Sequence, residues 1–331
     1  MRGAAAAGAV TSPVVSAVAF VFPGQGSQYV GMGRPLADTS PGAAAAFATV
    51  DDALGERLSA LIWDGPAETL DLTVNAQPAI LACSIALLRA LQERGLNLQP
   101  RFFAGHSMGQ YSALVAAGVI ELTDAARLVR ERGRLMQASA EDGAMAAIIG
   151  LPDERLADLE AAGSAAGVFT IANRNSPGQV VVSGERAAVE AAAETAKAMG
   201  AKRALMLPVS VAAHSPLMAR AADGMKEALA GVQFADPRAP LLANADARPL
   251  ETGEACRAEL IEHLTRGVDW VAAVESMSAA GISAFVEVGP GKVLSGLIRR
   301  IAAGALAHAV DDSSADGHLA LPSFAQAPSP A

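Results

Sequence analysis

The chain has 331 residues, of which 52% are hydrophobic, 18% charged and 4% aromatic, and its formal net charge is −9. This length fits two domains of ~150 residues each, or one large α/β domain with an insertion. The apolar fraction provides a sizeable core and excludes wholesale disorder. The acidic balance and the few aromatic residues argue against nucleic-acid binding, which uses basic patches and stacking rings.

Membrane, redox and targeting signals are weak. The longest apolar run, residues 76–88, is shorter than the ~18 residues that a membrane span needs, and it ends at Arg89. Cys83 and Cys256 lie far apart and form no Cys-x-x-Cys pair, which excludes a zinc knuckle and fits a reducing compartment. We therefore expect a cytoplasmic protein. Residues 1–16 are expected to form a flexible N-terminal extension rather than a signal peptide.

Strands and helices alternate over the first part of the chain. Residues 17–22 (AVAFVF) end at Pro23-Gly24, which predicts a buried strand followed by a tight loop. A buried helix is predicted over 76–91, a strand over 101–105, a helix from Met108 onward and an amphipathic helix over 123–137. This alternation indicates a mostly parallel sheet with helices on both faces.

The middle of the chain has a different pattern. We predict, in order, a strand over 144–149, a helix over 152–162, strands over 169–172 and 179–183, a helix over 185–199 and a strand over 203–207. The order βαββαβ is the ferredoxin-like split motif. Residues 141–207 are therefore expected to form an inserted ferredoxin-like small domain.

After Pro208 the first pattern resumes. Helices are predicted over 215–229, 271–280 and 292–301, and strands over 240–242 and 284–288. The catalytic domain is thus expected to be a discontinuous α/β domain formed by residues 17–140 and 208–302. Residues 303–331 are rich in Ala, Ser, Asp and Pro and are expected to form a disordered tail.

The strongest chemical signal is Gly105-His106-Ser107-Met108-Gly109, a G-x-S-x-G between a predicted strand and a predicted helix. A nucleophile elbow requires that context, because the glycines permit the sharp turn that exposes the serine hydroxyl. The helix N-terminus behind it offers backbone N–H groups and positive potential to an oxyanion. Ser107 is therefore the candidate nucleophile, with a plain turn as the alternative.

A serine nucleophile needs a base, and the chain has five histidines. His308 and His318 lie in the expected tail, and the ring of His106 is expected to point away from the neighbouring hydroxyl. Of the remaining two, we favour His214 over His263, because it opens HSPLM at a predicted strand-to-helix junction, where catalytic residues of α/β proteins gather. No Asp or Glu is evident as the group that orients the base, and a main-chain carbonyl is a candidate.

Two glycine-rich segments do not match phosphate-binding loops. Gly24-Gln25-Gly26 lacks the third glycine of a dinucleotide fingerprint, and residues 289–292 (GPGK) lack the Walker spacing. Gln25 follows a buried strand and instead suits an oxyanion donor, with a polar turn residue as the alternative.

Several segments together carry a resemblance to a known family. They are FVFPGQGSQ, TVNAQPAIL, GHSMGQYSALVAAGVI, RGRLMQ, NSPGQVVVSG, LPVSVAAHSPLM and EVGPGKVLSGLIRRI, in this order over residues 17–301. The set resembles malonyl-CoA:acyl carrier protein transacylases and is similar to polyketide synthase acyltransferase domains. The resemblance implies an α/β-hydrolase-like large domain with a ferredoxin-like insertion, in agreement with the element pattern.

The resemblance also implies roles for individual residues. Ser107 is the implied acyl-accepting nucleophile and His214 its base, with Gln25 and the backbone N–H of Met108 as the oxyanion hole. Arg132, in RGRLMQ, is implied to pair with the malonyl carboxylate; an ordinary solvated helix charge is the alternative. A planar guanidinium holds a carboxylate bidentately, which lysine does not match.

Five further positions concern the implied pocket and its surroundings. Gln77 and Asn175 match pocket positions of the family. Gln110 stands where Glu is usual, which changes a charge near the site. His263 stands where Gln is common, but the family uses a main-chain carbonyl there, so we expect the change to be harmless. Ala213 is smaller than the Phe of many malonyl-selective relatives, and a roomier pocket discriminates against an added methyl group by only ~1–3 kcal/mol.

These implications predict a ping-pong transfer of malonyl from malonyl-CoA, through Ser107, to the phosphopantetheine thiol of an acyl carrier protein in fatty-acid biosynthesis. No metal or redox cofactor is expected. The alternatives are a trans-acting polyketide acyltransferase, a hydrolase of carrier-bound acyl groups on the same scaffold, and a catalytically silent carrier-binding module.

The expected partners constrain the surface. CoA and carrier proteins are acidic, so local basic clusters must attract them. Lys202-Arg203 and Arg299-Arg300 are the candidates, with solvated surface charge as the alternative for each. We expect a monomer, because no sustained heptad or exposed apolar stripe is evident.

Overall fold

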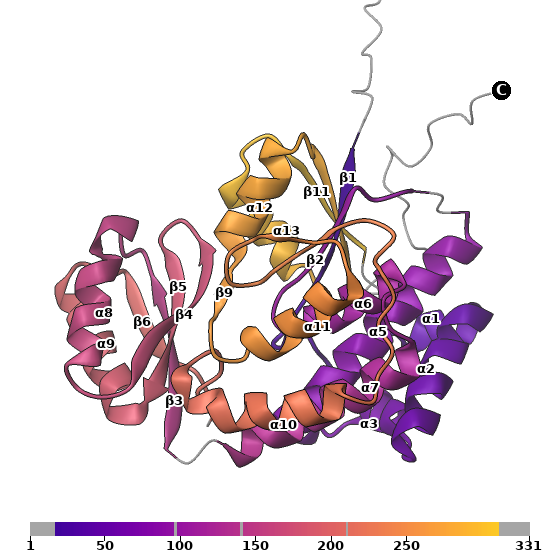
Figure 1. The fold of residues 1–331 in the computed structure, drawn as a ribbon, viewed down its shortest axis with the longest axis horizontal. Coiled ribbons are helices and arrows are strands. Elements are labelled where there is room, and N and C mark those ends of the chain that lie inside the picture. Colours follow the sequence, from indigo (N-terminus) through magenta and orange to yellow (C-terminus); the bar gives the residue numbers. More distant parts are fainter. Residues whose placement is uncertain (1–16, 96–97, 140–141, 210, 311–331) are drawn as a thin grey trace, which may run out of the picture.

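The computed structural model describes residues 17–95, 98–139, 142–209 and 211–310. It has a mixed α/β fold with two sheets, and most of its helices pack around the larger one (Figure 1). The expected N-terminal extension, 1–16, and residues 311–331 of the expected tail lie outside the described residues.

The larger sheet has the strand order β11-β10-β1-β2-β7-β8. Its pairs are parallel except for β7 with β8, which confirms the predicted mostly parallel sheet. Its strands are β1 (Val18–Phe22), β2 (Phe102–Gly105), β7 (Leu241–Leu242), β8 (Pro249–Leu250), β10 (Ala284–Val288) and β11 (Leu306–Val310).

Both faces of this sheet are covered, as the continuous apolar run of β1 predicts. Val18, Phe20 and Phe22 enter one core, whereas Ala19 and Val21 enter another on the opposite face. The second face is covered by α12 (Trp270–Ala279) and α13 (Val293–Ile301). The helices that contribute to the first core are α1 (Arg34–Thr39), α2 (Pro41–Leu54), α3 (Leu58–Asp64), α4 (Ala67–Leu70), α5 (Thr73–Glu93), α6 (Gly109–Ala117), α7 (Leu122–Ala138), α10 (Ala219–Leu229), which follows the 3-10 turn η2 (Pro216–Met218), and α11 (Gly253–Glu262).

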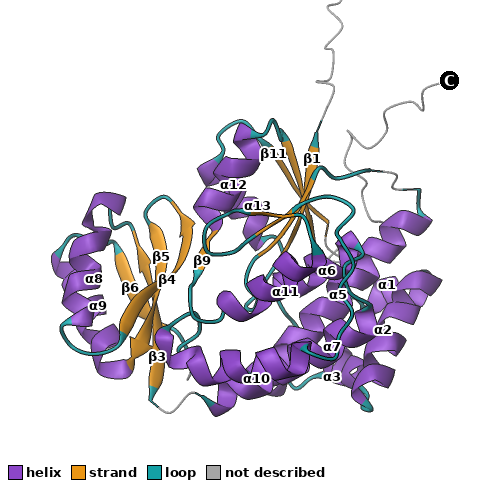
Figure 2. Cartoon of the chain, in the orientation of Figure 1, coloured by secondary structure: helices purple, strands orange, loops and turns teal. Residues whose placement is uncertain are grey.

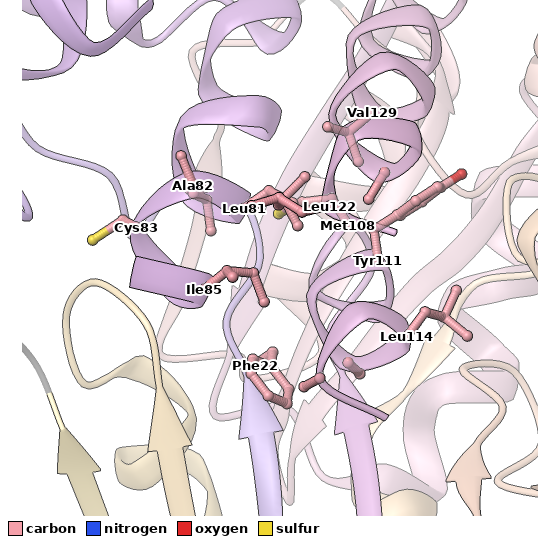
Figure 3. Close-up of a cluster of buried hydrophobic side chains, with 14 of the residues drawn as sticks. Phe22, Leu81, Ala82, Cys83, Ile85, Met108, Tyr111, Leu114, Leu122 and Val129 are labelled. Carbon is pink, nitrogen blue, oxygen red and sulfur yellow. The ribbon is translucent and has the colours of Figure 1, made fainter. Parts of the chain in front are cut away.

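Helix α5 is the central helix of the first core and confirms the buried helix predicted over 76–91. Leu81 and Ile85 of α5 lie near Phe22 and near Met108 and Tyr111 at the start of α6 (Figure 3). Among the described residues, α5 alone is long and apolar enough to span a membrane, but 83% of its most apolar 18-residue window is buried inside the protein.

The smaller sheet has the strand order β6-β3-β5-β4-β9, antiparallel except for β4 with β9. Helices α8 and α9 pack on its outer face, away from the larger sheet (Figure 2). The other face carries Met145, Ala172 and Val181, which pack with Leu207 and Ala213. Its elements are β3 (Gly143–Ile149), the 3-10 turn η1 (Asp153–Arg155), α8 (Leu156–Ser164), β4 (Phe169–Ser176), β5 (Gln179–Glu185), α9 (Arg186–Ala198), β6 (Arg203–Met206) and β9 (Val268–Asp269).

The expected disordered tail was placed too early in the chain. Leu306–Val310 form β11, which pairs in parallel with β10 and buries Val310. The LAHAV segment is short and adjoins the Asp- and Ser-rich sequence that follows it, so no separate strand was predicted, but the edge of β10 satisfies its main-chain groups. The larger sheet therefore continues beyond residue 302, and His308 lies in a strand.

Candidate active site

Ser107 lies in a tight turn between β2 and α6. Its φ of 54° falls in the left-handed region, which side chains other than glycine rarely adopt. A Cβ atom on Gly105 would lie 2.1 Å from the carbonyl carbon of Gly109, and one on Gly109 would lie 2.2 Å from the oxygen of Phe22. Only glycine fits at these two positions, so the strand and the helix approach closely and the turn exposes the serine hydroxyl.

The serine hydroxyl contacts a histidine that is itself oriented. The distance from Ser107 Oγ to His214 Nε2 is 2.7 Å, and the distance from His214 Nδ1 to the carbonyl oxygen of His263 is 2.6 Å. Because a carbonyl only accepts hydrogen bonds, Nδ1 carries the proton and Nε2 is left to accept the serine proton. His263 caps the C-terminus of α11, where main-chain carbonyls carry partial negative charge.

His214 is 3% exposed, and its surroundings keep it neutral. Burial, together with the positive charge of Arg132, lowers the pKa of His214 to about 3. The imidazole is therefore unprotonated at neutral pH, which is the form that a general base needs. The ring of His263 is fully buried behind it, and burial lowers the pKa of His263 well below its ordinary value.

Arg132 is a buried guanidinium, 1% exposed, on α7. Its Nη1 donates to Gln77 Oε1 at 2.7 Å and its Nη2 to Ser107 Oγ at 3.1 Å. Among the residues that the structure describes, no carboxylate lies within ion-pair distance of it, and its Nε has no partner. Burial lowers the pKa of Arg132. A buried charge without a counterion is costly, and a bound anion would remove that cost.

The neighbouring arginines of α7 differ from Arg132. Arg130 pairs with Glu56 and Arg134 with Glu131, and these side chains reach the surface. The alternative of a solvated helix charge fits Arg134 but is wrong for Arg132.

A cleft of about 650 Å³ separates the larger sheet from the inner face of the smaller one. Met145 and Val181 of the smaller sheet form part of its wall. Seven of the predicted site residues line it, namely Gln25, Ser107, Met108, Arg132, Asn175, Ala213 and His214. Over the described ranges, no group of three or more His, Cys, Asp or Glu side chains is placed to hold a metal ion.

Gln25 and Met108 lie in this cleft with Ser107. Gln25 Nε2 donates to Thr73 Oγ1 at 3.1 Å, which fixes the side-chain amide. Met108 precedes the first residue of α6, where N–H groups lack helical acceptors. Both residues line the cleft beside Ser107, which places a side-chain amide and the start of a helix near its hydroxyl.

Asn175 reaches the elbow from the smaller sheet. Its Oδ1 lies 2.9 Å from His106 Nε2, and the His106 ring lies 5.8 Å from the Trp270 ring. Burial lowers the pKa of His106. The His106 ring is thus hydrogen-bonded to Asn175, whereas the Ser107 hydroxyl is hydrogen-bonded to His214.

Gln110, Gln77 and His263 lie behind the cleft surface. Gln110 Oε1 accepts the main-chain N–H of Gly105 at 3.1 Å, and its Nε2 donates to the carbonyl of Leu242 at 3.0 Å. An amide has both the acceptor and the donor that these bonds use, whereas an ionised Glu would have no proton for Leu242.

The sequence-based search missed Asn244 and Thr73. Asn244 Oδ1 accepts the main-chain N–H of Ser107 at 2.8 Å. Asn244 follows β7, and its place as a polar residue just after a predicted strand was a signal that could have revealed it. Thr73 had no comparable signal, because its contact with Gln25 depends on how α5 packs.

Comparisons with known proteins point to one family. A family model described as the acyl transferase domain matches residues 19–309. The malonyl CoA-acyl carrier protein transacylase of Escherichia coli K12 is 48% identical over 299 residues, which cover 90% of this chain and 96% of the relative.

Solved structures of similar fold belong to the same group of enzymes. The crystal structure of an acyl-carrier-protein S-malonyltransferase from Bartonella henselae has 46% identity and a TM-score of 0.87, covering 90% of this chain and 96% of that one. A malonyl-transacylase solved in complex with its type II polyketide synthase acyl carrier protein has 44% identity and a TM-score of 0.85, covering 90% and 97%. The chain therefore belongs to the acyl transferase family and, within it, to the malonyl CoA-acyl carrier protein transacylases.

Proposed function

We propose that this protein transfers a malonyl group from malonyl-CoA to the phosphopantetheine thiol of an acyl carrier protein and so supplies extender units for fatty-acid biosynthesis. One observation carries the proposal. The buried Arg132 guanidinium, with no carboxylate partner among the described residues, donates to the same Ser107 Oγ that faces His214 Nε2. A nucleophile thus lies beside a cationic pocket, as a short acyl group with a free carboxylate requires.

In the first half-reaction, His214 Nε2 takes the Oγ proton as Ser107 Oγ attacks the thioester carbonyl carbon. The amide of Gln25 and the N–H of Met108 stabilise the oxyanion. The C–S bond then breaks, the CoA sulfur takes the proton from His214, and malonyl-serine remains with its carboxylate on Arg132.

The second half-reaction reverses these roles. His214 takes the proton of the phosphopantetheine thiol, and the thiolate attacks the ester carbonyl. The bond to Oγ breaks and Ser107 recovers its proton from His214. Each proton and each bond is accounted for by these side chains, so we expect no metal or redox cofactor.

For the carrier, the Arg299-Arg300 cluster on α13 has the better position. Arg300 Nη1 donates to Gln179 Oε1 at 2.7 Å, and Gln179 lines the cleft. The Lys202-Arg203 cluster is less suitable. Arg203 begins β6, where it pairs with Ile149, whereas the cleft-lining Leu207 follows the other end of that strand.

The remaining expectations belong to the same proposal. We propose an α/β-hydrolase-like catalytic domain interrupted by a ferredoxin-like insertion over 141–207. The strand order β6-β3-β5-β4, with α8 and α9 on one face, supports that division. We further propose that the enzyme acts as a cytoplasmic monomer.

The experiment is intact-protein mass spectrometry after brief incubation with malonyl-CoA, followed by addition of holo-carrier protein. The expected result is a malonyl adduct that is absent in Ser107→Ala and moves to the carrier. Label retained by Ser107→Ala would refute the mechanism. An adduct that decays to free malonate while the carrier stays unloaded would favour the hydrolase alternative.

A further inference from the structure

A buried carboxyl group lies behind the reacting side chains and has no role in the mechanism above. Glu259, on α11, is 1% exposed. Its Oε1 accepts the main-chain N–H of Asn244 at 2.7 Å. An ionisable side chain in such a place costs folding free energy, which a well-packed apolar residue would not.

Asn244 connects Glu259 to the nucleophile. Its main-chain N–H donates to Glu259, its carbonyl accepts the N–H of Asp269 at 2.7 Å, and its Oδ1 accepts the N–H of Ser107 at 2.8 Å. Ser107 has a left-handed backbone conformation, which persists only where the surroundings determine it. The bond from Asn244 is one such determinant, and Glu259 helps to fix Asn244.

The same residue lies one helical turn before the carbonyl that orients the base. The main-chain oxygen of Glu259 accepts the N–H of His263 at 3.0 Å. The carbonyl of His263 in turn accepts the Nδ1 proton of His214 at 2.6 Å. Short chains of hydrogen bonds therefore lead from Glu259 to both members of the reacting pair.

We propose that Glu259 is a positioning residue for acyl transfer, which sets the placement of Ser107 relative to His214 through Asn244 and through the end of α11. The 2.7 Å contact between Oγ and Nε2 joins segments that are far apart in the sequence. Glu259 contacts Asn244, which holds the backbone of Ser107, and it lies on α11, whose end holds the ring of His214. This inference rests on the Ser107–His214 mechanism proposed above.

The charge state of Glu259 affects this network. Arg248 Nη2 lies 3.7 Å from Oε2 and favours the ionised form, and His263 Nδ1 lies 3.9 Å from Oε1. Burial opposes ionisation and raises the pKa of Glu259 to about 7. The other titratable groups near it are Asp246, Glu262 and Cys256. Since an ionised carboxylate accepts more strongly, the bond to Asn244 tightens as pH rises through that pKa.

The test compares Glu259→Ala and Glu259→Gln with Glu254→Gln, which changes an 84% exposed side chain of the same helix. Quenched-flow mass spectrometry at increasing malonyl-CoA gives the rate constant of serine acylation and the apparent Kd. We expect Glu259→Ala to lower the rate constant ~10–100-fold. Its apparent Kd should not change, because the substrate contacts Arg132 rather than Glu259. Glu259→Gln keeps a neutral acceptor for Asn244, as protonated Glu259 does, so its rate constant should lie between those of Glu259→Ala and the wild type and should match the low-pH plateau of the wild type. Glu254→Gln should match the wild type.

The pH profile separates positioning from general stability. The wild-type acylation rate should rise with a midpoint near pH 7, and Glu259→Gln should remove that step. A wild-type rate in Glu259→Ala, or an unchanged pH step in Glu259→Gln, overturns the inference. Where Glu259→Ala does not fold, the pH profile of Glu259→Gln decides. If the wild type forms the malonyl adduct but the Glu259 variants do not behave as expected, only the positioning role of Glu259 is refuted. If the wild type forms no adduct, both the proposed function and this role are refuted.

Discussion

Replacing Arg132 by alanine removes the proposed carboxylate pocket. The guanidinium has five N–H groups. Nη1 donates to Gln77 and Nη2 to Ser107, while Nε has no partner, so further N–H groups remain available to a carboxylate. Each hydrogen bond to a charged group contributes ~1.5–3 kcal/mol, so a two-bond fork contributes on the order of 3–6 kcal/mol. At ~1.4 kcal/mol per factor of ten, malonyl-serine formation should slow ~10²–10⁴-fold.

The assay measures kcat/KM for malonyl-CoA and for acetyl-CoA with the same enzyme preparation. An acetyl group has no carboxylate, so Arg132→Ala should lower kcat/KM for acetyl-CoA much less than kcat/KM for malonyl-CoA. Arg132→Lys keeps the charge without the fork and should give an intermediate loss. Arg134→Ala is the matched control, because Arg134 lies on the same helix, is 60% exposed and pairs with Glu131. Equal losses for both acyl groups would refute the role of Arg132 as a carboxylate clamp.

Three further predictions concern the elbow, the base and the carrier. Gly105→Ala should destabilise the protein by at least ~2 kcal/mol in urea unfolding, because its Cβ would meet the main chain at 2.1 Å. Gly296→Ala, on α13 with open space around its Cβ, should be neutral or stabilising, and similar effects of the two changes would contradict the close-approach argument. Because the proposed base, His214, acts in its neutral form and its pKa is lowered to about 3, the acylation rate of the Glu259→Gln variant should stay constant between about pH 5 and pH 8; a step near pH 6.5 would show that the pKa of His214 is unperturbed. Arg300→Glu should raise the KM for the carrier more than that for malonyl-CoA, and equal changes would contradict docking at α13.

The sequence predicts the elements that have a clear pattern of their own. The apolar run 17–22, the long buried helix over 76–91 and the strand 284–288 appear as β1, α5 and β10 with shifts of at most a few residues at their ends. The elbow was found because two glycines flank Ser107 between a strand and a helix. His214 was found by elimination, which works because the chain has five histidines.

Other features depend on contacts between distant segments and leave little local signal. Strand β11 exists because β10 offers an edge, and LAHAV alone does not predict it. The buried Glu259 resembles any helix carboxylate in sequence, and only the packing of α11 beside β8 brings it to Asn244, which follows β7. The burial of Arg132 is of the same kind, because α7 carries several arginines and the packing selects one of them.

Strand β9 has a consequence for the independence of the smaller sheet. Its residues, Val268 and Asp269, come from the chain after the larger sheet's β8, yet they pair with Asn173 and Arg174 of β4 (Figure 1). Arg174 Nη1 also donates to Asp269 Oδ2 at 2.7 Å. A segment 141–207 transplanted into another protein would lack this neighbour and would expose the edge of β4, which invites association with other strands. Exchange of this module between acyltransferases therefore requires that the segment around β9 move with it.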